Sequence, residues 1–153
     1  MKNKKLIAVI NTLVRINNDR IEGYETASKE TNNKEITNLF FQFIQTSKKC
    51  NVELISEVLQ MGGKPEEKTK ISGKFFRVWM EVKAALTSNN QNSILLSCEY
   101  GEKNAIQTYN KVILNNANEL NEDQQKIIAL QLILINKDHS NLRDLREKIL
   151  VSA

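Results

Sequence analysis

Two glutamates and the single histidine of the sequence have the types and spacing of a metal site. Glu99 and Glu102 lie three residues apart in a segment of helical periodicity, so both carboxylates can point from one helix face. His139 lies in a later helical segment, where a packing helix would carry Leu or Ile. Iron, manganese and zinc accept carboxylate and neutral imidazole ligands. Together the three side chains could form half of a metal site.

Acidic residues from the first half of the chain could complete this site. Asp19 and Glu22 lie at the margins of the first apolar stripe, from which they could point inward. Glu53 and Glu57, in the second helical segment, are the alternative. The predicted metal ligands are therefore Glu99, Glu102, His139, Asp19 and Glu22, with iron, manganese or zinc as the metal.

The same residues have a purely structural interpretation. Buried carboxylates and a lone histidine can satisfy one another by hydrogen bonds, and such polar networks can specify the register of a bundle. Asn17, Tyr24 and Tyr109 are further partners for such a network. No serine or cysteine can be assigned to His139 as a nucleophile, so the sequence predicts no reaction class. Catalysis is not expected under this interpretation.

Composition predicts one all-α domain over residues 1–153, since one Pro and five Gly leave few breaks in long helices. The 22 Lys and Arg against 18 Asp and Glu are scattered, whereas nucleic-acid binding needs a clustered stripe. No apolar run approaches the roughly 18–20 residues that span a bilayer. We therefore expect a cytoplasmic protein without nucleic-acid or membrane partners.

Two cysteines, Cys50 and Cys98, lack the spacing of zinc ligands and are too few for a disulfide framework. Both fall on inward stripes, which could let them meet as a redox pair. Inert core thiols are the alternative. Buried, reduced thiols are the default expectation for both cysteines.

Apolar periodicity predicts four principal helices. They extend from Leu6 to about Lys29, from Asn32 to Met61, from Ile94 to Val112 and from Asn121 to Ile149. Asn32 with Glu35, and Asn121 with Gln124, have the spacing of capping boxes. The Gly62–Pro65 run is a strong stop signal.

The chain between the second and third principal helices is predicted to cross over the bundle. Residues 66–70 are charged and suit a solvated connection. A short extra helix is then expected from Phe75 to Leu86, with Ser72 as its N-cap and Trp79 in the core. Residues 87–93 are rich in turn-forming side chains. Short loops elsewhere predict two antiparallel hairpins within a four-helix bundle.

Some apolar residues fall off the inward stripes and suggest a second apolar face. They are Leu39, Phe41, Leu96 and Leu130. A face that the core does not use would suit self-association. The sequence therefore also fits a homo-oligomeric scaffold bundle without metal.

Several short motifs together resemble the uncharacterised ferritin-like four-helix-bundle proteins of bacteria. They span nearly the whole chain: Asn18–Tyr24, Val52-Glu53-Leu54, Met61–Pro65, Trp79-Met80 with Lys83–Leu86, Glu99-x-Gly101-Glu102, and Asp138-His139-x-x-Leu142-Arg143-x-Leu145. The resemblance implies a ferritin-like antiparallel bundle with a crossover between the second and third principal helices. It implies no known reaction.

The chain departs from the ferritin-like pattern at the metal ligands. Di-iron members carry Glu-x-x-His on two helices, and this sequence has no Glu-x-x-His at all. Its second helix carries Ser47, Cys50 and Leu54 where a metal-binding imidazole would lie. A full di-iron centre is not expected. A metal-handling, stress-related protein with a reduced site and a metal-free scaffold both remain open.

Overall fold

Four long helices make up the described part of the chain, which contains no strand. The computed structural model describes residues 2–29, 31–66, 84 and 90–152. The helices are α1 (Lys2–Ser28), α2 (Lys34–Gln60), α4 (Gln91–Asn115) and α5 (Glu122–Ser152). The predicted all-α, four-helix class is confirmed. None of the described helices is long and apolar enough to cross a membrane.

Capping side chains set where the helices begin. Asn121 and Gln124 form the predicted capping box at α5: each side-chain oxygen accepts a hydrogen bond from the other residue's backbone N–H, at 2.8 and 3.0 Å. The predicted cap of α2 was one residue early. Asn33, not Asn32, accepts from the Ile36 backbone N–H at 3.0 Å. Asn90 caps α4, which therefore begins ahead of the expected Ile94.

The α2 helix ends at the predicted glycines. Gly62 has φ = +77°, a left-handed conformation that glycine adopts without steric cost. The Gly63 N–H then donates to the Val58 carbonyl at 2.9 Å. These bonds satisfy backbone groups that the last turn of a helix leaves unpaired.

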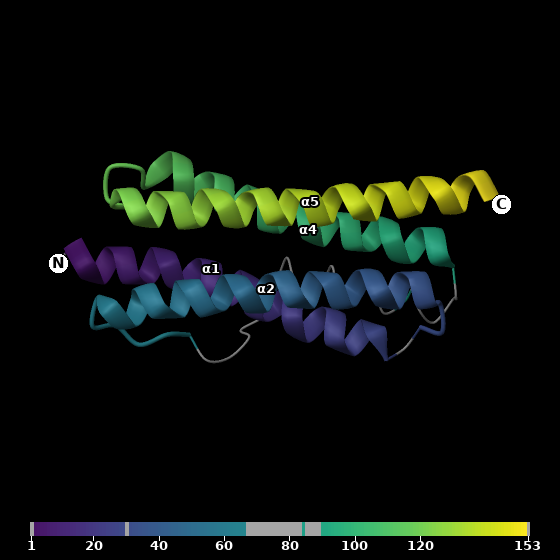
Figure 1. Cartoon of the computed structure of the whole chain (residues 1–153), viewed down its shortest axis with the longest axis horizontal. Helices are drawn as coiled ribbons and strands as arrows, with labels where there is room; N and C mark the ends of the chain where they lie inside the picture. Colours follow the sequence, from purple (N-terminus) through teal and green to yellow (C-terminus); the bar gives the residue numbers. More distant parts are fainter. Residues whose placement is uncertain (1, 30, 67–83, 85–89, 153) are drawn as a thin grey trace.

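Contacts at the two ends of the bundle establish the helix directions. The Asn11 side chain of α1 donates to the Lys64 carbonyl just beyond α2, and Lys5 pairs with Glu119 in the α4–α5 loop. At the opposite end, Lys148 of α5 pairs with Glu35 of α2. Thus α1 and α5 run one way and α2 and α4 the other, as Figure 1 shows.

The chain after α2 consequently has to connect opposite ends of the bundle to reach α4. Its path, the crossover expected there and the cap at Ser72 lie outside the described residues. So does the expected helix from Phe75 to Leu86, including Trp79, except for Ala84.

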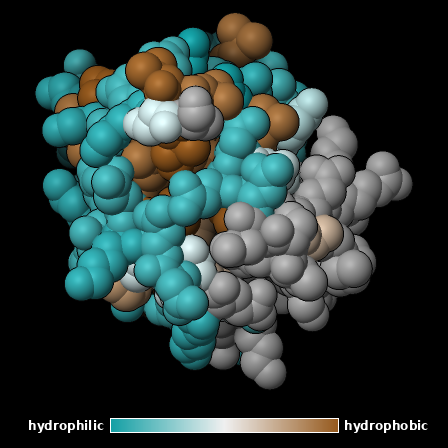
Figure 2. Space-filling view, turned by 90° about the vertical axis from the view of Figure 1, so that its right-hand side faces the viewer, coloured by the Kyte–Doolittle hydropathy of each residue, from teal (hydrophilic) through white to brown (hydrophobic). Residues whose placement is uncertain are grey.

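The core has two apolar halves with polar side chains between them. One half gathers around Tyr24, Phe40 and Phe43, and the other around Leu13, Leu54 and further apolar residues. Seen from the end where α5 finishes, hydrophobic surface lies near the centre of the bundle, framed by hydrophilic side chains (Figure 2). The polar middle is the feature that a plain hydrophobic bundle would lack.

The left-handed turn at Gly62 generates a stability prediction. No atom lies within 4 Å of an added Cβ, so Gly62→Ala introduces backbone strain without a clash. We expect it to lower the free energy of unfolding by about 1 kcal/mol, measured by urea denaturation. Asn tolerates this conformation, so Gly62→Asn should cost less. Equal stability of the glycine and alanine proteins would contradict the prediction.

Candidate functional site

Arg20 lies at the centre of the bundle with its guanidinium group out of contact with solvent. Periodicity places it there, because it follows the inward Asn17 by three residues and precedes the inward Tyr24 by four. The residue is only 1% exposed. A buried charge of this kind needs partners on every side.

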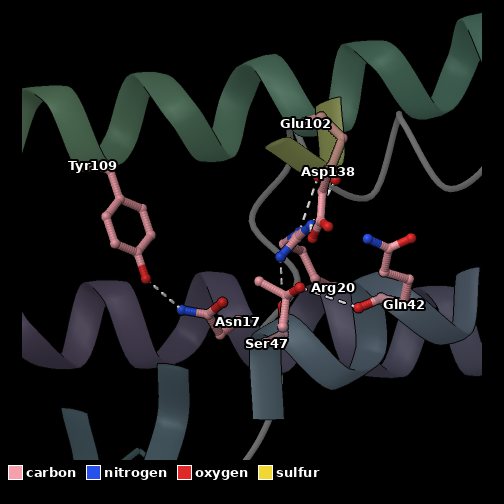
Figure 3. A network of polar contacts seen from close by, with 8 residues as sticks. Asn17, Arg20, Gln42, Ser47, Glu102, Tyr109 and Asp138 are labelled. Carbon is pink, nitrogen blue, oxygen red and sulfur yellow. Dashed lines mark hydrogen bonds and ion pairs between the residues drawn. The ribbon is translucent and has the colours of Figure 1, made fainter. Parts of the chain in front are cut away.

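Side chains from the other three helices supply those partners (Figure 3). Both oxygens of Glu102 accept hydrogen bonds from Arg20, from Nη2 at 2.6 Å and from Nε at 2.9 Å. Asp138 Oδ2 lies 3.2 Å from Nη2, and Ser47 Oγ accepts from Nη1 at 2.7 Å. We call Arg20, Ser47, Glu102 and Asp138 the arginine layer. Each helix contributes one member.

Aromatic rings close the arginine layer on one side. The Arg20 Cζ atom lies 5.6 Å from the centroid of the Phe43 ring and 6.0 Å from that of Tyr24. A guanidinium group at this distance can be stabilised by cation–π attraction. The rings also keep water away from the cation, which strengthens its attraction to the carboxylates.

Arg20 is the one cation in contact with both carboxylates of the arginine layer, so the protonation of these groups depends on how it is shared. Burial opposes charge on Arg20, but Glu102 beside it raises the pKa of the guanidinium, so Arg20 stays protonated. Burial raises the pKa of Asp138 to about 6, although Arg20 acts in the opposite direction. Glu102 receives two bonds from Arg20 and Asp138 receives one. Asp138 is therefore a carboxyl group with a raised pKa that is held to the cation by a single contact.

A second polar layer crosses the bundle next to the first. Asn17 Nδ2 donates to the Tyr109 hydroxyl at 2.8 Å, and this hydroxyl donates to Gln131 Oε1 at 2.8 Å. Gln131 Nε2 in turn donates to the Cys50 carbonyl at 3.1 Å. Burial raises the pKa of Tyr109, which keeps its hydroxyl protonated as a donor. Asn17 and Tyr109 were expected as partners of the glutamates and the histidine, but here they bond to each other and to Gln131.

Of the predicted metal ligands, Glu99 and His139 lie together at the α4–α5 edge of the bundle. Glu99 Oε1 is 3.4 Å from His139 Nε2. The same carboxylate accepts a hydrogen bond from Arg146 and has Lys103 at 3.9 Å. Glu102 is separate from this pair, because both of its oxygens are bonded to Arg20.

Asp19 and Glu22 from α1 differ in their surroundings. Asp19 is buried, and its Oδ1 atom has no hydrogen-bond partner among the described residues. Burial raises the pKa of this carboxyl to about 7, with a lowering contribution from Arg15 and a raising one from Glu22. Glu22 itself is exposed. Of the alternative ligands, Glu53 accepts from Gln131 at 3.2 Å.

Across the described part of the chain, no three His, Cys, Asp or Glu side chains are grouped so that they could hold a metal ion. The two cysteines are both free and buried. Burial raises the pKa of Cys50 to about 11 and that of Cys98 further, which disfavours the reactive thiolate. Among the candidate ligands, Glu99 and His139 approach each other to 3.4 Å.

Sequence reasoning assigned no role to Arg20 or Asp138. Asp138, next to His139 in the sequence, is 2% exposed and binds Arg20. The available signal for Arg20 was its spacing from Asn17 and Tyr24. The predicted internal cluster of Glu102 therefore exists, but its cation is an arginine and not the histidine.

Removal of the buried cation should destabilise the fold strongly. Arg20→Met leaves Glu102 and Asp138 without their counter-charge, and we expect a loss of about 3–5 kcal/mol in urea denaturation. The triple variant Arg20→Met, Glu102→Leu, Asp138→Leu removes all three charges and should recover much of that loss.

The matched control for this experiment is an exposed ion pair. Lys148 and Glu35 are 3.2 Å apart with side chains 67% and 57% exposed, so Lys148→Ala should cost less than about 1 kcal/mol. A cost for Arg20→Met as small as that of Lys148→Ala would show that the arginine layer does not hold the bundle together.

The raised pKa values of Asp19 and Asp138 predict a pH dependence. Because the folded protein binds these protons more tightly than the unfolded chain, the stability they contribute is complete below about pH 4. It is lost as the pH rises through about 6 for Asp138 and about 7 for Asp19. Asp19→Asn should therefore stabilise the protein more at about pH 8 than at about pH 5, measured by urea midpoints.

The exposed Asp144 offers a control for the aspartate-to-asparagine change. Asp144→Asn should shift the midpoint by a similar small amount at both pH values. If Asp19→Asn behaves in the same way as Asp144→Asn, the Asp19 carboxyl does not titrate in the expected range.

Comparison with known proteins places the chain in a family. The model of a domain of unknown function, DUF2383, matches residues 5–115. This part includes Arg20, Ser47 and Glu102 and ends with the last residue of α4, so Asp138 lies beyond it. No curated protein matches the sequence significantly. Because the match covers well over half of the 153 residues, the chain belongs to the family defined by the DUF2383 domain of unknown function.

Proposed function

We propose that this protein is a non-catalytic helical bundle that acts through association with protein and not through a metal in its interior. The observation that carries the proposal is the state of Glu102. Both of its oxygens bind Arg20, at 2.6 and 2.9 Å, in a site from which solvent is excluded. A metal ion there would have to displace a guanidinium group that already supplies the positive charge.

The exposed apolar residues support the association half of the proposal. Phe41, Leu96 and Leu130, which the sequence placed off the inward stripes, are all exposed. The fourth such residue, Leu39, was predicted wrongly, because it is buried in the core beside Phe40. Exposed side chains of this size favour contact with another protein when they lie together on one surface.

A metal site at the α4–α5 edge is the second candidate. The 3.4 Å approach of Glu99 to His139 supports it, because a carboxylate and an imidazole at this distance could share one cation. The positive charges of Arg146 and Lys103 beside Glu99 oppose a cation at the same place. Iron, manganese and zinc remain the metals to test.

The helix directions support a ferritin-like arrangement as part of the proposal. In such bundles α1 and α5 would run parallel to each other and antiparallel to α2 and α4, with a long connection between α2 and α4. The contacts of Asn11, Lys64, Lys148 and Glu35 fit these directions. The path of the chain between α2 and α4, followed by cross-linking to α1 and α5, would test the crossover itself.

Elemental analysis of purified, untagged protein loaded with iron, manganese or zinc tests the first candidate. We expect much less than one metal ion per chain in the wild type, and no change in Glu102→Gln or His139→Ala. Lys126→Ala, an exposed substitution on α5, controls for metal gained or lost during purification and loading. Circular dichroism shows whether each variant folds.

Two outcomes would overturn the metal-free proposal. Near-stoichiometric metal that Glu102→Gln abolishes would place a site in the bundle interior. Near-stoichiometric metal that only His139→Ala abolishes would establish the edge site and the second candidate.

A further inference from the structure

The outer surface of α2 carries a largely apolar stripe, and within the described residues only its member Ile55 packs partly against the core. Phe41, Val52 and Leu59 point outward and are 51%, 72% and 59% exposed. They belong to a series with alternating steps of four and three residues, which we call the α2 stripe: Phe41, Gln45, Lys48, Val52, Ile55 and Leu59. This spacing is that of the seam through which two helices pack in a coiled coil.

A shallow groove runs along the α1 side of the α2 stripe, so that the stripe forms one wall of a concave surface. The groove has a volume of about 850 Å³ and is lined by residues of both α2 and α1. Ile21 of α1 lines it together with Val52, Ile55 and Leu59 of the stripe, and Lys48 is the one charged residue among its described lining. Lys48 Nζ lies 3.8 Å from Glu25 of α1, so its charge is turned toward α1 and its aliphatic stem remains on the stripe.

We infer that the α2 stripe is the contact surface for a second copy of this chain, with the two α2 helices antiparallel across a two-fold axis. The inference rests on the proposed function, for which it names the partner. In a two-fold dimer the same surface faces itself with its order reversed. Reversal of the α2 stripe sets Phe41 against Leu59, Gln45 against Ile55 and Lys48 against Val52 of the other copy.

This pairing places apolar residues together at both ends and keeps like charges apart. At each end of the stripe, Phe41 of one copy faces Leu59 of the other. In the middle, each facing pair contains one polar and one apolar residue. The charged Lys48 faces Val52 and is not set directly against the second Lys48. Two copies whose like charges faced each other would repel. The antiparallel order avoids this repulsion.

The size of the contact predicts a weak dimer. From Phe41 to Leu59 the stripe covers 18 residue steps, which is about 27 Å along a helix. One pair of helices buries of the order of several hundred Å² per copy, at the lower limit for a specific interface. We therefore expect dissociation in the range of about 10–100 μM, with exchange between monomer and dimer.

Sedimentation velocity from about 1 to 300 μM, with charge-exchange variants, tests both the surface and its register. Wild type should shift from monomer toward dimer over this range. Val52→Lys sets two lysines against each other and should weaken the dimer at least about tenfold. The double variant Lys48→Glu, Val52→Lys places opposite charges across the axis and should restore the dimer. Leu114→Lys, at a residue that is 81% exposed on α4, should leave association unchanged.

Three results would overturn the inference: a wild type that stays monomeric, a Val52→Lys variant that associates as wild type does, or a double variant that stays as weak as Val52→Lys. The first two exclude the surface and the third excludes the register. Each leaves the elemental analysis unaffected, so failure of this pairing is distinguishable from failure of the metal-free proposal. Circular dichroism confirms that the variants, which alter exposed positions, remain folded.

Discussion

The neutralisation of Arg20 is the constraint on which the rest of the structure depends. A guanidinium group in a dry interior is tolerable only if carboxylates and other acceptors surround it. Here those acceptors come from α2, α4 and α5, while the cation comes from α1. The bonds form only when all four helices are aligned along the bundle axis to within a fraction of a turn. Apolar side chains, which pack without direction, do not impose such an alignment by themselves.

Local sequence signals predicted the helices well, because amphipathic periodicity and capping act over a few residues. The Asn121–Gln124 box and the Gly62 stop lie where the pattern placed them. The cap of α2 was shifted by one residue because Thr31, Asn32 and Asn33 offer similar side chains, and only the fold selects Asn33. Leu39 was placed off the stripe because the buried face of α2 is wider than one line of residues.

The candidate site was less predictable, because its bonds join residues 27 to 118 positions apart. Periodicity indicated that Glu102 points inward, but it gives no register between helices. Without that register the partner of Glu102 could equally be His139, which instead contacts Glu99 near the surface. Arg20 was missed because a long cationic side chain at the border of a stripe is usually solvated. Its spacing on α1 directs it inward, and the acidic partners on the other hairpin make burial of its charge tolerable.

The charges of the arginine layer are divided between the two halves of the chain. The hairpin of α1 and α2 contributes the cation, and the hairpin of α4 and α5 contributes the two carboxylates. Docking of the two different hairpins sets the cation against carboxylates, whereas docking of two identical hairpins, from separate chains, would bring buried charges of one sign together. The layer thus favours pairing of the two different hairpins. A bundle with a uniformly apolar centre would have no comparable means of distinguishing its own second half from a copy of its first.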